Sequence, residues 1–156
     1  MSTLSESAPV DIRLQSDAQR LLDAVGWQGV AMVEFRVNPE GVPYLMEVNT
    51  RFWGSLQLAI DSGVDFPWLL YCKSTGRSVA VPAGYRIGRR LRWFLGDVDS
   101  LYMSLRDART PVKQKMVRLM SFLTPQPVST RHEVFRWGDP MAGLFEFREY
   151  IRDLLN

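Results

Sequence analysis

The stretch VEFRVNPEGVPYLMEVNTR, residues 33–51, determines how the rest of the chain is organised. Apolar and polar residues alternate on both sides of Asn38-Pro39-Glu40-Gly41, and the residue types of that tetrapeptide favour a tight turn. The pattern therefore predicts a β-hairpin with strands over residues 28–37 and 42–49.

The register of this hairpin follows from the length of its loop. If the last two residues of the turn form the loop, Glu34 lies opposite Glu47, and Arg36 lies opposite Leu45. Side chains alternate between the two faces of a strand. One face then carries the polar set Glu34, Arg36, Glu47, Asn49 and Arg51. We expect the other face to point into a core with Val33, Phe35, Met46 and Val48.

Two opposed carboxylates on this hairpin would be stabilised by a cation bound between them. Directly opposed Cβ atoms lie about 4.5–5.5 Å apart, so the charges of Glu34 and Glu47 repel each other. With Asn49 they form an all-oxygen ligand set, which suits Mg²⁺ or Mn²⁺ and not zinc. Mg²⁺ is usually held by one or two carboxylates plus substrate phosphates, and Arg51 beside it suits an anion. The patterning alone is equally compatible with a surface hairpin whose charges are merely solvated.

The composition narrows the class of protein. With 156 residues the chain is long enough for one domain with a core, and its single cysteine excludes an internal disulfide. The single histidine, His132, excludes sites built on several histidines. The sequence contains no apolar run long enough to span a membrane and no signal-peptide pattern at its start, so we expect a cytoplasmic protein.

The remaining elements predict an α+β fold with an antiparallel sheet and packed helices. We expect an arm or linker over residues 1–15, a portion that contains the metal-binding hairpin over 16–78, and an α+β extension over 79–156. The expected helices cover residues 17–25, 54–62, 65–76, 100–108, 111–123 and 139–155, and further strands cover 85–95 and 131–137. In the strand over 85–95, Arg90 and Arg92 share one face, which suits either a basic wall facing an anion or a solvated strand surface.

Glu34-Phe35 followed by Glu47-Val48-Asn49-Thr50-Arg51 resembles the C-terminal metal-binding hairpin of the ATP-grasp superfamily. That superfamily includes biotin carboxylases, carbamoyl-phosphate synthases, D-alanine–D-alanine ligases and carboxylate–amine ligases. The resemblance extends over about residues 16–75, through Gly26-Trp27-Gln28-Gly29 before the hairpin and Asp61-Ser62-Gly63-Val64-Asp65 after it. It implies the C-terminal subdomain of the ATP-grasp fold.

The resemblance also assigns roles to single residues. It implies that Glu34, Glu47 and Asn49 bind one or two Mg²⁺ ions with ATP, and that Arg51 is catalytic and stabilises the acyl phosphate or the transferred phosphoryl group. Met46 would pack on adenine, although the register above places it on the core face. We expect Arg36, which replaces an apolar residue, to contact a phosphate or the ribose or to pair with an acidic substrate group.

Features of a complete ATP-grasp enzyme are missing. The sequence has no Gly-rich lid, and its lysines, Lys73, Lys113 and Lys115, all follow the hairpin. We therefore expect the C-terminal part of a longer ATP-dependent ligase that joins a small-molecule carboxylate to an amine, inactive as a fragment. The alternative is a degenerate remnant that serves as a non-enzymatic binding or oligomerisation module. We expect no nucleic acid or membrane partner, and a homodimer formed through the apolar face that truncation exposes.

Overall fold

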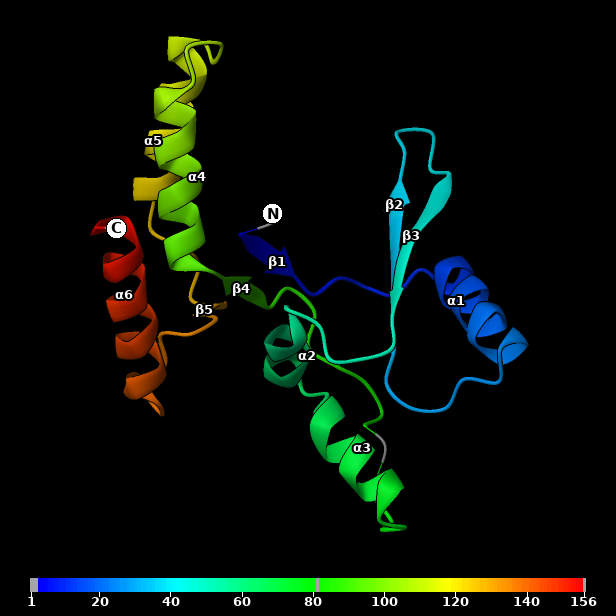
Figure 1. Cartoon of the computed structure of the whole chain (residues 1–156). Coiled ribbons are helices and arrows are strands. Elements are labelled where there is room, and N and C mark those ends of the chain that lie inside the picture. Colours follow the sequence, from blue (N-terminus) through cyan, green and yellow to red (C-terminus); the bar gives the residue numbers. More distant parts are fainter. Residues whose placement is uncertain (1–2, 81, 156) are drawn as a thin grey trace. The chain divides into compact units, whose positions relative to one another are not determined.

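The computed structural model describes residues 3–80 and 82–155. The chain forms two compact units: Ser7–Gly88, and a second unit that joins the segment up to Glu6 to the chain from Arg89 onward. Both helices and strands are present (Figure 1), which confirms the predicted α+β class. The expected arm contains structure, because Leu4–Glu6 forms strand β1. No helix in the described part of the chain is both long and apolar enough to cross a membrane.

The Ser7–Gly88 unit begins with helix α1, Ile12–Ala24. The sequence Ser16-Asp17-Ala18-Gln19 has the pattern of a capping box, so the helix was expected to begin at residue 17. The structure shows instead that Asp11 is the N-cap, because its carboxylate accepts a hydrogen bond from the Arg13 backbone N–H at 2.9 Å. Ser16 therefore lies inside the helix. No residue of α1 is buried.

Strands β2, Met32–Val37, and β3, Pro43–Asn49, form the predicted antiparallel hairpin (Figure 1). The prediction that one face of the hairpin points into a core is wrong. Met46 is 55% exposed and Val48 is 37% exposed, while Val33 and Phe35 are only half-buried. The hairpin is therefore held mainly by its own backbone hydrogen bonds and cross-strand side-chain pairs.

Helices α2, Leu56–Ser62, and α3, Phe66–Ser74, follow the hairpin and contact each other. The helix expected over residues 65–76 is capped by Asp65, because its side chain accepts a hydrogen bond from the Trp68 backbone N–H at 2.9 Å. Cys72 on α3 is only 1% exposed. The sequence Val79-Ala80-Val81-Pro82 is typical of an extended segment, and Val81 within it lies outside the described residues.

The second unit contains a three-stranded sheet in the order β1-β4-β5. Strand β4 covers Arg90–Arg92, and β5 covers Thr130–His132. Strand β1 pairs with β4 in antiparallel orientation, as predicted for the sheets, but β5 pairs with β4 in parallel orientation. The strand predicted over residues 85–95 is therefore much shorter, because the chain enters a helix directly after Trp93.

Three helices complete this unit: α4, Phe94–Arg106; α5, Val112–Leu123; and α6, Pro140–Leu155. Helices α4 and α5 lie side by side as an antiparallel pair (Figure 1). The first turn of α4, which the sequence reading assigned to a strand, packs under Trp93. A Cβ atom at Gly96 would overlap the Trp93 ring, so the close approach requires glycine.

Arg92 fits neither of the two interpretations of the basic strand. Its side chain is only 10% exposed and forms an ion pair with Asp97 of α4. The guanidinium carbon also lies 5.3 Å from the centre of the Phe122 ring. Arg90 forms its own ion pair with Glu6 at 2.6 Å. Both arginines therefore hold the elements of this unit together.

Candidate metal and nucleotide site

The turn of the hairpin sets the position of every residue in the candidate site. Asn38 and Val42 face each other across the turn, since the Asn38 N–H donates to the Val42 carbonyl at 3.0 Å. The Asn38 Oδ1 also accepts from the Val42 N–H at 2.7 Å, and Gly41 adopts φ +79°. The loop therefore has three residues rather than the predicted two, and its last position favours glycine.

The register nevertheless places Glu34 opposite Glu47, as predicted. Nearer the turn the pairing differs by one residue, so that Phe35 lies opposite Leu45, and Arg36 lies opposite Tyr44 instead of the predicted Leu45. A register shift between Glu34 and Phe35 accounts for the difference. The longer loop and this β-bulge offset each other, and the two carboxylates remain opposed.

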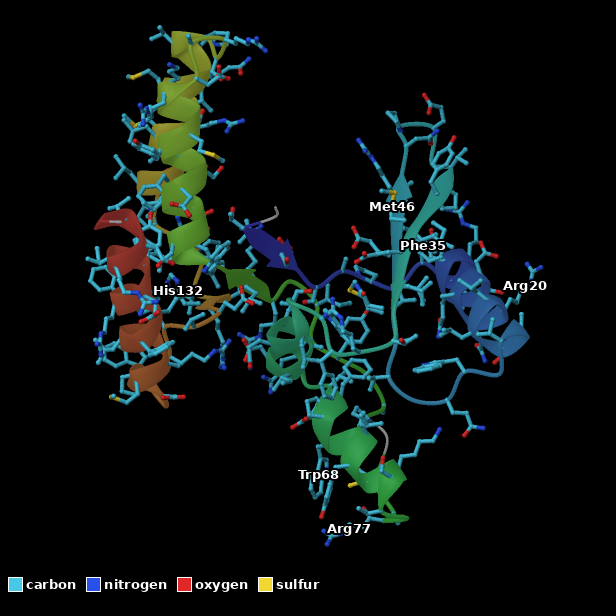
Figure 2. All side chains as sticks on the ribbon, viewed as in Figure 1. Arg20, Phe35, Met46, Trp68, Arg77 and His132 are labelled. Atoms are coloured by element: carbon cyan, nitrogen blue, oxygen red, sulfur yellow. The ribbon has the colours of Figure 1, made fainter. Side chains whose placement is uncertain are left out.

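Met46 is the extra residue of the bulge and has no partner on β2. Figure 2 shows Met46 together with Phe35 on the hairpin. Because of the bulge, Leu45 lies on the same face as Phe35. The side chain of Met46 no longer follows the regular alternation between the two faces of β3. This resolves the conflict between the core-face register and the adenine contact expected for Met46. The adenine contact itself stays a prediction.

Asn49 and Glu47 lie on one face of β3, two residues apart. The Asn49 side-chain amide donates to Glu47 Oε1 at 2.6 Å, which orients the carboxylate. Glu34 and Glu47 are exposed, and Asn49 is half-buried. The second carboxylate oxygen of Glu47, both oxygens of Glu34 and the amide oxygen of Asn49 remain available as hard oxygen donors.

In the described ranges, no three His, Cys, Asp or Glu side chains gather closely enough to hold a metal ion. A metal at the hairpin would therefore depend on two carboxylates, one amide oxygen and a ligand such as a nucleotide phosphate. This composition matches Mg²⁺, which keeps several positions for water and substrate.

The two hairpin arginines are exposed. Arg51 donates from Nη1 to the Phe52 carbonyl at 3.0 Å. No carboxylate in the part of the chain that the structure describes pairs with Arg51 or Arg36. Both cations are therefore available to an anion, and Tyr44, opposite Arg36, is 55% exposed beside it. Sequence reasoning missed Tyr44 because the predicted register put Leu45 in its place.

One comparison with known proteins finds a match that covers the hairpin. A family model described as ATP-grasp in the biosynthetic pathway with Ter operon matches residues 9–94, a span that includes the whole hairpin. The chain therefore belongs to the ATP-grasp superfamily and, within it, to the family of that description. Membership indicates an ATP-binding function of the ligase type. No curated protein and no solved structure matches the chain.

Proposed function

We propose that this chain supplies the metal- and nucleotide-binding part of an ATP-grasp ligase that activates a carboxylate as an acyl phosphate. An amine or a similar nucleophile then displaces the phosphate and forms the product bond. One observation carries the proposal: Glu34 and Glu47 are directly opposed, and Asn49 is hydrogen-bonded to Glu47. The family match over the same residues supports it.

Glu34, Glu47 and Asn49 are the residues that would hold Mg²⁺ or Mn²⁺, since their free atoms are all oxygens. With the ion bound, these three residues would place positive charge at the phosphates of ATP, which is the chemistry that phosphoryl transfer needs. The hydrogen bond from Asn49 fixes the orientation of the Glu47 carboxylate before any ion binds.

Arg51 would stabilise the negative charge of the acyl phosphate or of the transferred phosphoryl group. Its position two residues beyond Asn49, without a carboxylate partner among the described residues, supports this role. Arg36 would contact a phosphate or the ribose, and Met46, which is 55% exposed in the bulge, would pack on adenine. The partners would be ATP, a small carboxylate, an amine and a second copy of the chain.

Metal-dependent ATP binding tests the proposal. We expect calorimetry to show ATP binding by this chain only with Mg²⁺ or Mn²⁺, and Glu47→Gln to weaken it by about tenfold or more. Glu40→Gln is the matched control, because Glu40 is an exposed carboxylate in the turn of the same hairpin and outside the opposed pair. It should bind ATP like the wild type.

If ATP binds equally without a metal, or Glu47→Gln binds like Glu40→Gln, the proposal is wrong. A chain that binds no ATP but associates with itself would instead support the non-enzymatic module. The exposed apolar side chains of the chain, such as Val117 and Met120, favour that second candidate.

A further inference from the structure

A second hollow lies in the Ser7–Gly88 unit and plays no part in the metal site. It has a volume of about 220 Å³ and is lined by helix α2, the segment before it, the start of α3 and two short stretches near residues 8 and 85. Its walls are mainly apolar and aromatic, with Trp53, Leu58, Phe66 and Tyr85 among them. Of the residues that the structure describes, those that line it carry no charge.

Contacts within the unit hold these walls in place. The Trp53 and Phe66 rings meet edge to face, with their centres 5.2 Å apart. The Tyr85 hydroxyl donates to the Ala8 carbonyl at 2.6 Å. The Arg86 N–H donates to the Ser62 carbonyl at 2.8 Å, which anchors the adjoining segment to α2. The pocket is therefore formed before a ligand arrives.

Ser62 places an unused polar group in this wall. The residue is only 3% exposed, and its hydroxyl oxygen has no hydrogen-bond partner among the described residues. Buried polar groups are nearly always hydrogen-bonded, because leaving one unpaired is unfavourable. Since Ser62 lines the pocket, a ligand in the pocket is positioned to supply the missing partner.

Size and lining together define the ligand. A cavity of about 150 Å³ is enough to bind benzene, so about 220 Å³ accommodates a ring-sized group with a polar substituent. We propose that this pocket binds an uncharged aromatic or branched aliphatic group whose single hydrogen-bonding atom pairs with Ser62. This group belongs to the carboxylate substrate, whose activated end would lie at Arg51. Trp53 in the pocket wall follows Arg51 by only two residues, at most about 7 Å of chain. This substrate assignment rests on the proposed function.

Two neutral probes, p-cresol and toluene, test the pocket by ligand-observed NMR on the full chain. The wild type should bind both at a saturable site and prefer p-cresol. Ala59→Phe should abolish both, because Ala59 lines the pocket. Ala142→Phe is the matched control at an exposed position of α6 and should bind like the wild type. Circular dichroism establishes that each variant is folded.

Ser62→Ala tests the polar contact without adding bulk, and it stands even if Ala59→Phe fails to fold. It should lower the affinity for p-cresol about fivefold and leave that for toluene unchanged. Binding that survives Ala59→Phe, or a preference for p-cresol that survives Ser62→Ala, overturns the proposal. So does the absence of saturable binding to the wild type.

The link to the substrate has a separate readout. 4-Hydroxyphenylacetate carries the p-cresol ring and a carboxylate. Arg51→Gln should weaken its binding and leave p-cresol binding unchanged. If the wild type and Arg51→Gln bind 4-hydroxyphenylacetate with equal affinity, the carboxylate assignment is overturned. Glu47→Gln should weaken metal-dependent ATP binding by about tenfold or more and keep p-cresol binding. A wild type that binds p-cresol but no metal-dependent ATP contradicts the proposed function alone. A wild type that binds ATP with the metal but neither probe contradicts the pocket alone.

Discussion

Glu34 and Glu47 repel each other across the hairpin as long as no cation is bound. We therefore expect Glu34→Gln to stabilise the metal-free chain by about 0.5 kcal/mol and to remove the stabilisation that Mg²⁺ gives the wild type. Urea denaturation with and without Mg²⁺ measures both effects. Glu40→Gln, whose carboxylate is outside the pair, should behave like the wild type; a metal response retained in Glu34→Gln would contradict the opposed-carboxylate site.

His132 should make the second unit sensitive to acid. Burial, followed by the nearby Arg92 charge, lowers the pKa of His132, and Asp97 opposes this more weakly. The folded state therefore binds this proton less readily than the unfolded state, so stability is full above about pH 6.5 and falls as the pH drops below it. Burial and Glu146 raise the pKa of Glu133, which acts in the opposite direction as the pH falls.

The comparison with His132→Gln isolates the histidine. We expect the melting temperature of the wild type to fall between about pH 7.5 and 5.5, and that of the variant to fall less. Thermal unfolding followed by circular dichroism measures both slopes. Identical slopes would mean that His132 does not contribute.

At the scale of single residues, the sequence predicted the opposed carboxylates but not the geometry that opposes them. Asn38-Pro39-Glu40-Gly41 suits a two-residue or a three-residue loop, and the Asn38 side chain selects the longer one by bonding to the Val42 N–H. The bulge at Met46 has no residue signature of its own, since no glycine marks it. The three-residue loop and the bulge each shift the register by one residue in opposite directions, so the pairing of Glu34 with Glu47 agrees with the prediction.

The bulge in β3 gives a test at the scale of the element. Deleting Met46 should leave Glu34 opposite Glu47, because the pairing nearer the turn then continues without a shift. We expect the deletion to keep Mn²⁺ binding, measured by electron paramagnetic resonance, and to weaken ATP binding through loss of the adenine contact. Met46→Ala keeps the bulge and should weaken ATP binding alone. Loss of Mn²⁺ binding in the deletion would contradict the register.

The ion pair between Arg92 on β4 and Asp97 on α4 is nearly buried, with 10% and 17% of the side chains exposed. Removing one partner leaves the other charge uncompensated, so we expect Arg92→Met to destabilise the second unit by about 3 kcal/mol. Adding Asp97→Leu should bring stability back to within about 1 kcal/mol of the wild type. Chemical denaturation of the single and double variants measures the coupling between Arg92 and Asp97. If the double variant loses the sum of the stability losses of the single variants, the coupling is absent and the prediction is wrong.

Element boundaries were predicted well where a cap is unambiguous and badly where two signals compete. The expected helices ended at residue 62 and began at residue 65, and the structure has Gly63 as the C-cap of α2 and Asp65 as the N-cap of α3. Near α1, Asp11 and Ser16 are both suitable caps, and only the structure shows which one is used. The start of α4 was missed because the apolar residues around Trp93 fit a buried strand or a buried helix equally well.

For the whole chain we predict self-association. Helix α5 exposes Val117 to 61% and Met120 to 56%, and such apolar side chains favour contact with a second copy. Light scattering at high concentration should show dimers or larger species. The double variant Val117→Glu/Met120→Glu should shift them toward monomer, while Lys113→Glu on the same helix should not. A strictly monomeric wild type would contradict the expectation.

The division into units was the hardest feature to read from the sequence. Strand β1 pairs with β4, and Leu4 faces Arg92, so the contact joins residues that no local pattern connects. The portions expected from the sequence meet after residue 78, and the compact units of the structure divide after Gly88. Long-range pairing of three-residue strands leaves too little periodicity to detect.

Cys72, the only cysteine of the chain, gives the Ser7–Gly88 unit a built-in probe of its opening. A thiol reagent can reach a side chain that is 1% exposed only after α3 separates from its surroundings. The labelling rate therefore counts opening events of one unit, while the apolar residues that hold the other unit, Leu91 and Leu95, give no signal. If a nucleotide or a pocket ligand makes opening of the Ser7–Gly88 unit rarer, modification of Cys72 will slow by the same factor. Mass spectrometry can follow this modification without engineering the protein.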